Sequence, residues 1–441
     1  MPERRGTDTG PVANECLAVI ANPYMHIFIK NILLDEQRTN IVIDQNIITG
    51  IGKQLQMPVN AICIDGSHLA AFPALANCHT HAAMTLFRGF GDDHPLNEWL
   101  NNYIFPKEKE LTAERVYWGT RLACLEMIKS GTSCMNDMYY FTPEVIQAVA
   151  DSGIRATLGY SVSDMFDSQK AETCKQVYRE LEPLMQDSHH GRIHYSAAPH
   201  SIYTVSDTML KWLSDYAQEH DMLYHIHMSE TTKEVDDCLK QYGCRPYQYL
   251  DKMGILEQCR DRFIGAHSLW LSGDEIELMG SYAINVVHNP NSNLKLGSGH
   301  AFLLKELSRQ GVNITLGTDG CSSSNNLDMI EAAKVMALLQ KGWRKDPTIL
   351  DAHEALSIAT LNGYKAQRFN GGRLEVGALA DIMLVDLNNI AFIPNNDTLS
   401  NLIYSAHGDC VDTLICDGEL LMQNRIVADE DTIITNISRL I

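Results

Sequence analysis

Hydrophobic and polar residues alternate in short runs at both ends of the chain. The N-terminal runs are MHIFIKNILL, NIVIDQNIITGIG and NAICIDGSHLAAF, and similar runs, ADIMLVDL and VDTLICDGELLMQNRIV, occur near the C-terminus. A period of two with many β-branched residues is typical of strands that bury one face. We therefore predict that residues 25–72 and 375–441 together form a small β-sandwich domain.

The middle of the chain, residues 73–374, repeats a different pattern. Short apolar runs are each followed by a segment of helical periodicity, which is typical of βα units around a parallel sheet. The runs are AAFPALANCHTH, GTSCMNDMY, IRATLGYSV, RIHYSAAPHS, MLYHIHMSE, FIGAHSLW, AINVVHNP and NITLGTDG. Eight such units in about 300 residues predict an α/β fold, a TIM-type (β/α)₈ barrel that forms the catalytic domain.

Polar side chains gather where these apolar runs end. In a parallel barrel the carboxyl ends of the strands meet on one face, which is where active sites lie. The residues at or just beyond these ends are His79, His81, Asp137, His200, His227, Glu230, His267, His288 and Asp319. The sequence therefore predicts a polar site at this face.

Three imidazoles and one carboxylate from these ends could hold a metal ion. His79 and His81 form an H-x-H pair, and a period of two points both rings to the same side of a strand. The pattern alone is weak, because His225 and His227 repeat it. His227 and Asp319 add two ligands from other strands, which gives a set that suits Zn²⁺ and leaves a position for water. The alternatives are a helix-capping role for Asp319 and a hydrogen-bonded core position for His227.

Two further residues suggest proton chemistry at this site. Glu230 follows His227 by three residues, where the strand gives way to a loop, so a general acid or base role fits it. A solvated loop carboxylate is the alternative. His267 could hydrogen-bond a metal-bound water, and Asp319 could accept the proton of that water.

Composition excludes several classes of partner. The formal net charge of −20 argues against nucleic acids and anionic membranes, which need a positive field. No apolar run reaches the roughly 18 residues of a spanning helix, and the N-terminus has no apolar signal region. The 12 cysteines include no C-x-x-C pair, as expected for reduced thiols. We expect a cytoplasmic protein without a membrane partner, whose residues 1–24 are a disordered leader.

Several long motifs occur in a characteristic order: NCHTHAAMTLFRG, APHSIYT, HIHMSET, HNPNSNLKLGSG, TLGTDGCSSSNNLDM and GGRLEVGALADIMLVD. With them the chain resembles the amidohydrolase superfamily, in particular its methylthioadenosine/S-adenosylhomocysteine deaminase branch, which is close to triazine-hydrolase-like enzymes. The resemblance implies a hydrolase that converts the 6-amino group of an adenine nucleoside (5'-methylthioadenosine, adenosine or S-adenosylhomocysteine) to an inosine-type product plus ammonia. A guanine-, 8-oxoguanine- or triazine-type aminohydrolase is the alternative, and a non-catalytic barrel relative is a third reading.

The resemblance also implies a metal centre and an assembly. It makes four residues the metal ligands: His79, His81, His227 and Asp319. We expect one divalent ion per subunit, because the fourth run, RIHYSAAPHS, lacks the lysine that bridges two ions in other members. We expect Zn²⁺, with Fe²⁺ or Mn²⁺ as alternatives. Related barrels are often dimers or tetramers, so we expect a homo-oligomer.

The other motif residues receive roles by the same resemblance. Glu230 is the residue that protonates the purine ring, His267 orients the attacking hydroxide, and Asp319 takes up its proton. Glu108, in IFPKEKE, matches the position that holds the ribose hydroxyls, although a solvated helix-start carboxylate is its alternative. His200, in PHSIY, matches a substrate-contacting histidine.

One substitution bears on which nucleoside is preferred. Relatives that bind S-adenosylhomocysteine are expected to hold its carboxylate with arginines after the third strand. In this chain Tyr160 aligns with one such arginine, Arg155 belongs to the start of the strand, and the next arginine is Arg179. A tyrosine hydroxyl cannot make the bidentate contact of a guanidinium. The sequence therefore favours methylthioadenosine or adenosine over S-adenosylhomocysteine.

Overall fold

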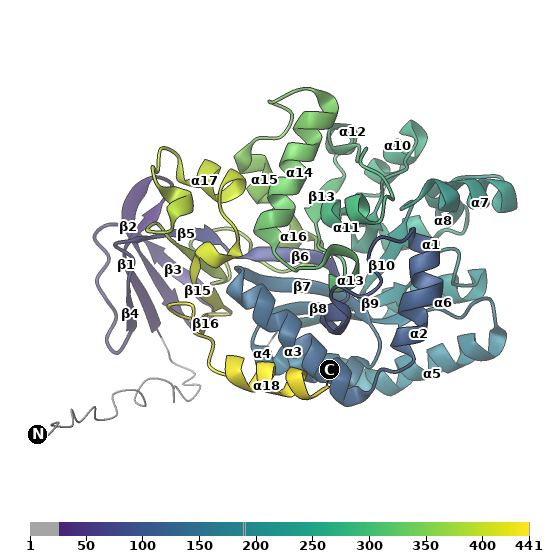
Figure 1. The fold of residues 1–441 in the computed structure, drawn as a ribbon, viewed down its shortest axis with the longest axis horizontal. Helices are drawn as coiled ribbons and strands as arrows, with labels where there is room; N and C mark the ends of the chain where they lie inside the picture. The colour runs from purple at the N-terminus through teal and green to yellow at the C-terminus, as the bar shows by residue number, and fades with distance from the viewer. Residues whose placement is uncertain (1–25, 188, 190, 441) are drawn as a thin grey trace, which may run out of the picture.

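The computed structural model describes residues 26–187, 189 and 191–440 (Figure 1). The predicted leader, residues 1–24, lies outside the described residues. The described chain contains two eight-stranded sheets, one built from the middle of the sequence and one built from both ends.

The middle of the chain forms a parallel barrel in which the strands follow one another in sequence order. The strands are β6 (Leu75–Thr80), β7 (Thr132–Tyr139), β8 (Arg155–Val162), β9 (Ile193–Pro199), β10 (Leu223–Met228), β11 (Phe263–His267), β12 (Asn285–His288) and β13 (Asn313–Leu316). Each of them coincides with one of the eight predicted apolar runs. The last strand meets the first where the backbone N–H of Asp319 donates to the carbonyl of His79 at 2.9 Å. The predicted (β/α)₈ barrel is confirmed.

Helices connect the strands and cover the outside of the barrel (Figure 1). They are α3 (Ala113–Lys129), α4 (Thr142–Ser152), α5 (Ser168–Met185), α6 (Asp207–Glu219), α7 (Thr232–Tyr242), α8 (Pro246–Lys252), α9 (Ile255–Cys259), α10 (Gly273–Ser281), α11 (Pro290–Lys295), α12 (Leu304–Arg309), α13 (Cys321–Ser324), α14 (Met329–Arg344), α15 (Ala352–Ala359) and α16 (Leu361–Ala366). Helix α4 ends at Gly153, whose φ of 81° is the left-handed conformation that glycine adopts without strain. No helix among the described residues is long and apolar enough to cross a membrane.

The second sheet joins the two ends of the chain, as the alternating pattern predicts. Its order is β16-β15-β14-β5-β1-β2-β3, with β4 paired to β1. The strands are β1 (His26–Leu34), β2 (Gln37–Asp44), β3 (Ile47–Ile51), β4 (Ile62–Asp65), β5 (Leu69–Pro73), β14 (Ile382–Asp386), β15 (Val411–Cys416) and β16 (Glu419–Met422). Isoleucines from both ends of the chain, among them Ile29 and Ile382, pack in one cluster on this sheet. The exact boundaries 25–72, 73–374 and 375–441 stay a prediction.

The C-terminal part also contains two helices that return to the barrel. Helix α17 (Thr398–Tyr404) packs on α14, and α18 (Glu430–Leu440) runs along α3 (Figure 1). The alternating runs of residues 375–441 predict only strands, so these two helices were not predicted.

A buried ion pair links the barrel to the terminal sheet. Arg155, at the start of β8, donates from Nε to Asp381 Oδ2 at 2.6 Å and from a terminal nitrogen to Asp417 Oδ1 at 2.5 Å. The hydroxyl of Tyr364 also donates to Asp381, at 2.8 Å. Arg155 therefore points away from the carboxyl face of the barrel.

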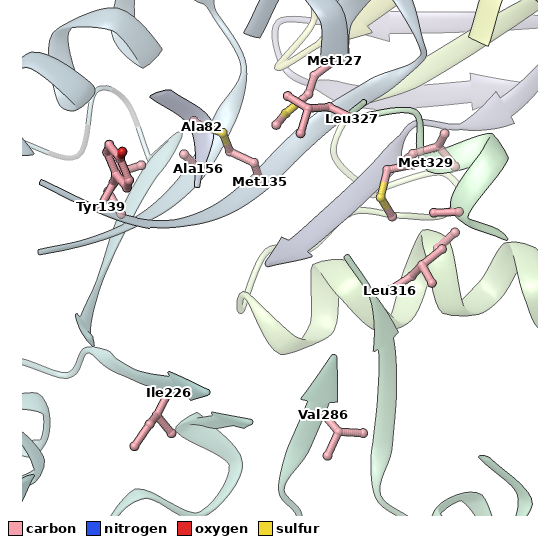
Figure 2. Close-up of a cluster of buried hydrophobic side chains, with 14 of the residues drawn as sticks. Ala82, Met127, Met135, Tyr139, Ala156, Ile226, Val286, Leu316, Leu327 and Met329 are labelled. Carbon is pink, nitrogen blue, oxygen red and sulfur yellow. The ribbon is translucent and has the colours of Figure 1, made fainter. Parts of the chain in front are cut away.

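Two hydrophobic layers lie on opposite sides of the barrel strands. The outer layer fills the space between strands and helices and includes Met135, Ala156 and Ile226 (Figure 2). The inner layer lies inside the barrel and includes Cys134 and Leu223. Successive side chains of a strand point to opposite faces. A strand residue next to a member of the outer layer therefore points into the barrel.

Candidate active site

Buried ligand-type side chains meet at the carboxyl ends of the barrel strands. His79, His227, His267 and Asp319 bring one possible ligand atom each to within 4.8 Å of one another. His81 joins them, because its Nε2 lies 3.2 Å from Asp319 Oδ1. The predicted residues from the first, fifth, sixth and eighth barrel strands are thus brought together.

Three separations between these atoms have nearly the same length. Asp319 Oδ1 lies 3.3 Å from His79 Nε2 and 3.2 Å from His81 Nε2. His81 Nε2 lies 3.3 Å from His227 Nε2. Ligand atoms placed tetrahedrally about 2.05 Å from a zinc ion are about 3.3 Å apart. The four side chains therefore fit the ligand set of a tetrahedral cation.

Backbone carbonyls fix the tautomers of two of the rings. His81 Nδ1 donates to the carbonyl of Met138 at 2.7 Å, and His227 Nδ1 donates to the carbonyl of His200 at 2.7 Å. Because a carbonyl only accepts, each ring keeps its proton at Nδ1 and presents an Nε2 lone pair. Two lone pairs that face each other need a positive charge between them. Burial lowers the pKa of His81, but the Asp319 carboxylate outweighs burial and raises that pKa to about 9.

Asp319 is held as a carboxylate with one oxygen available. Its Oδ2 accepts hydrogen bonds from Ser292 and Ser323, each at 2.7 Å. Burial raises the pKa of Asp319, but hydrogen bonds and charge from His79 and His81 hold it well below its usual range. Its side chain does not cap the following helix α13. The helix-cap alternative is therefore wrong.

Glu230 faces the same space from the loop after β10. It is 5% exposed, so it is not a solvated loop carboxylate, and burial raises its pKa. Ser298 donates to its Oε1 at 3.1 Å, and its Oε2 lies 3.8 Å from His267 Nε2. Glu234, which the sequence reasoning missed, accepts the backbone N–H groups of Ser229 and Glu230 at 2.7 and 2.9 Å and fixes this loop. The sequence could have pointed to Glu234, because it lies only four residues after Glu230.

His267 has the opposite tautomer from His81 and His227. Asn293 donates to its Nδ1 at 2.8 Å, so the ring carries its proton at Nε2, on the side of Glu230. Its backbone has a left-handed φ of 71°, which is costly for a residue with a side chain and typical of functional sites. The geometry suits a hydrogen-bond donor beside the four-ligand set. Sequence reasoning gave Asn293 no role, although it lies in the motif HNPNSN.

Glu108 and His200 line the cavity above this group, as their motifs predict. Glu108 ends α2 (Phe105–Glu108), where burial raises its pKa to about 7 against the opposing effect of a hydrogen bond with Tyr139. Burial lowers the pKa of His200 to about 3, so the ring is neutral. Its Nδ1 lies 3.0 Å from the Thr204 hydroxyl.

The cavity has a polar floor and a largely apolar wall. Its apolar wall comes from α1 (Leu96–Trp99), the π-helical turn η2 (Leu100–Ile104) and the start of α2. The residues of this wall are Leu96, Trp99, Leu100, Ile104 and Phe105. Among the described residues that line the cavity, none is a lysine or arginine, and Tyr160 is not one of them.

Three other polar residues of the strand ends have different surroundings. Asp137 accepts the backbone N–H of Ala82 at 2.6 Å and so supports the turn after His81. His288 is buried against Phe302, with stacked rings 4.2 Å apart. His225 lies with its Nε2 3.0 Å from His79 Nδ1. None of these three side chains lines the cavity.

With this geometry established, comparison with known proteins identifies the family. Residues 70–421 match the description "amidohydrolase family", which is most of the chain. The chain belongs to the amidohydrolase family. The match includes every barrel strand and each of the site residues described above.

Two curated deaminases are similar to this chain over most of its sequence. A 5'-deoxyadenosine deaminase of Methanospirillum hungatei is 46% identical over 373 residues, 85% of this chain and 82% of that protein. A 5-methylthioadenosine/S-adenosylhomocysteine deaminase of Archaeoglobus fulgidus is 42% identical over 371 residues, 84% of this chain and 86% of that protein.

Solved structures agree with the fold. An adenosine deaminase from Xanthomonas campestris with bound zinc is 32% identical, with a TM-score of 0.86 over 94% of this chain and 97% of that one. The zinc complex of the atrazine chlorohydrolase TrzN from Arthrobacter aurescens also has a TM-score of 0.86, but at 21% identity it supports the fold alone.

Proposed function

We propose that this amidohydrolase is a metal-dependent hydrolytic deaminase of adenine nucleosides. It converts the 6-amino group of the adenine ring to the oxo group of an inosine-type product and releases ammonia. The observation that carries the proposal is the set of ligand-atom separations of 3.2–3.3 Å among one carboxylate and three imidazoles, in a chain whose relatives are named deaminases.

One divalent ion is held by His79, His81, His227 and Asp319 in this proposal. We propose Zn²⁺, because the separations fit a tetrahedral zinc site and the similar adenosine deaminase structure contains zinc. A bound divalent cation of this kind lowers the pKa of water to about 7 and so supplies a nucleophile at neutral pH.

The protein's own groups move the protons. Glu230, whose pKa is raised by burial, donates a proton to the ring nitrogen next to the carbon under attack. His267 directs its Nε2–H toward the attacking oxygen and orients it. Asp319, whose low pKa keeps it ionised, accepts the proton of the attacking water through Oδ1. Asp319 then passes this proton to the departing amino group, and the remaining proton of the added hydroxyl returns to Glu230 as ammonia leaves.

The walls of the cavity orient the nucleoside. Glu108 accepts from the ribose hydroxyls, and His200 contacts the base as a neutral ring. The apolar wall suits a compact 5' substituent such as methylthio, hydrogen or hydroxyl. A homocysteine carboxylate finds no lysine or arginine among the described lining residues, so we propose that S-adenosylhomocysteine is the poorer substrate.

An ammonia-release screen of the zinc-loaded protein tests this function. The substrates are 5'-deoxyadenosine, methylthioadenosine, adenosine, S-adenosylhomocysteine, guanine, 8-oxoguanine and a chlorinated triazine. We expect kcat/KM to be highest for nucleosides with small 5' groups. A clear preference for S-adenosylhomocysteine contradicts the specificity, and turnover of guanine or triazines alone contradicts the substrate class.

We also propose that the enzyme is a homo-oligomer, dimer or tetramer, that works in the cytoplasm. Exposed apolar side chains on the loops after β7 and β8, Phe141, Met165 and Phe166, support association with a second copy. The cysteines of the described residues are free, which suits a reducing compartment. Light scattering of the purified protein gives the assembly directly.

A further inference from the structure

A second group of polar side chains lies inside the barrel, next to the candidate ligands on their amino-terminal side. We call it the inner polar layer; its members are Asn136, Thr157, Ser196 and His225, from the four consecutive strands β7 to β10, and each is fully buried. Their direction follows from their neighbours. Met135, Ala156 and Ile226 belong to the outer hydrophobic layer (Figure 2), so the adjacent residues face the barrel interior.

The inner polar layer is not satisfied by protein groups. Five of its atoms have no hydrogen-bond partner among the described residues: Asn136 Nδ2, Asn136 Oδ1, Thr157 Oγ1, Ser196 Oγ and His225 Nδ1. Barrel interiors are usually filled by branched apolar side chains. Polar groups buried without protein partners are usually satisfied by ordered water. The layer combines donors and acceptors, as a water molecule requires.

His225 connects this layer to a candidate ligand. Its Nε2 lies 3.0 Å from His79 Nδ1, and the two rings are nearly perpendicular, at 87°. When His79 presents its Nε2 lone pair to a cation, its proton is at Nδ1 and is donated to His225 Nε2. His225 must then carry its own proton at Nδ1. That N–H is fully buried and has no acceptor among the described residues.

We propose that His225 is a positioning residue that fixes the tautomer and orientation of His79, and that ordered water in the inner polar layer accepts the proton of His225 Nδ1. The inference rests on the metal-binding role proposed for His79. It gives different roles to the two histidines of the second H-x-H pair: His227 is a proposed ligand, whereas His225 hydrogen-bonds the ligand His79 on the side away from the metal. Loss of the hydrogen-bond partner of a metal-bound histidine typically weakens metal binding about 10- to 100-fold.

Zinc affinity of two variants tests the hydrogen bond. In His225→Leu the acceptor is lost, and we expect zinc binding, measured by competition with a chromogenic chelator, to weaken about 10- to 100-fold. His225→Gln keeps an amide oxygen for His79 and an N–H for the water, so it should recover most of the affinity. His288→Leu is the matched control, because His288 is equally buried on β12 but has no hydrogen bond to a ligand. We expect it to bind zinc as the wild type does.

Several results would overturn the positioning role. They are wild-type affinity in His225→Leu, an equal loss in His225→Leu and His225→Gln, and an equal loss in the His288→Leu control. Thermal unfolding of the metal-free variants shows whether they are folded before zinc is added. Wild-type protein that binds no zinc would contradict the proposed function. Equal zinc affinity of the wild type and the His225 variants would contradict only this inference.

A crystal structure of the zinc-loaded wild type tests the water without any substitution. We expect an ordered water within about 3.2 Å of His225 Nδ1 that also contacts a group of the inner polar layer. A dry layer, with His225 Nδ1 bonded to protein or to nothing, would overturn the inference even if a variant failed to fold.

Discussion

Replacement of Glu230 by glutamine separates proton donation from metal binding. The amide keeps the size of the carboxyl group and an oxygen that can accept from Ser298, so the buried side chain should stay in place. It has no proton to give to the purine ring. Loss of a positioned general acid costs about 10²- to 10⁴-fold in rate, which is about 3–5 kcal/mol in the barrier. Glu230 is not one of the four proposed ligands, and its carboxylate lies 3.8 Å from the ring of His267, so the zinc content should not change.

Single-turnover kinetics with methylthioadenosine give the chemical step directly, because slow product release does not enter them. Zinc is measured on the same preparation by atomic absorption. Ser298→Ala serves as a graded comparison, since it removes one hydrogen bond to Glu230 and should reduce the rate only about 3- to 10-fold. An unchanged rate in Glu230→Gln, with full zinc content, would refute the role of Glu230. Loss of zinc would show that it belongs to the metal site.

Three further predictions concern the ribose contact, the proton linkage and the link between the sheets. Glu108→Gln should raise KM for nucleosides much more than it lowers kcat, and a kcat effect alone would contradict ribose binding. Because the pKa of His81 is about 9, metal binding below pH 9 displaces a proton from this ring. Zinc affinity, measured by chelator competition, should therefore fall about tenfold for each unit of pH decrease. An affinity that does not change with pH would contradict this linkage. Arg155→Leu leaves Asp381 buried without its partner and should lower the free energy of unfolding by about 3–5 kcal/mol in a denaturant titration, with zinc affinity unchanged.

The barrel was predictable because each of its strands carries a clear local signal. A strand that is buried on both faces reads as a continuous apolar run, and the short runs at β11 and β13 are of this kind. The terminal sheet followed from its alternating isoleucines, including Ile29 and Ile43. Helices α17 and α18 were missed, because their sequences carry weaker patterns and their stability comes from packing on α14 and α3.

The convergence of four side chains was predictable, because each stands at or just beyond the end of a barrel strand: His79, His81, His227 and Asp319. The supporting groups were not predictable, because a hydrogen bond from Asn293 to His267 joins residues 26 positions apart and depends on tertiary structure. The same holds for the side chains that support the proposed ligands through hydrogen bonds: Ser292, Ser323 and His225.

The central claim is that one cation is held by side chains from the first, fifth and eighth barrel strands. Anomalous diffraction from crystals of the zinc-loaded protein, recorded on both sides of the zinc edge, tests it most directly. The account predicts a single peak about 2.0–2.2 Å from Nε2 of His79, His81 and His227 and from Oδ1 of Asp319. No peak within this group at saturating zinc, or a peak bound by other residues, would contradict it.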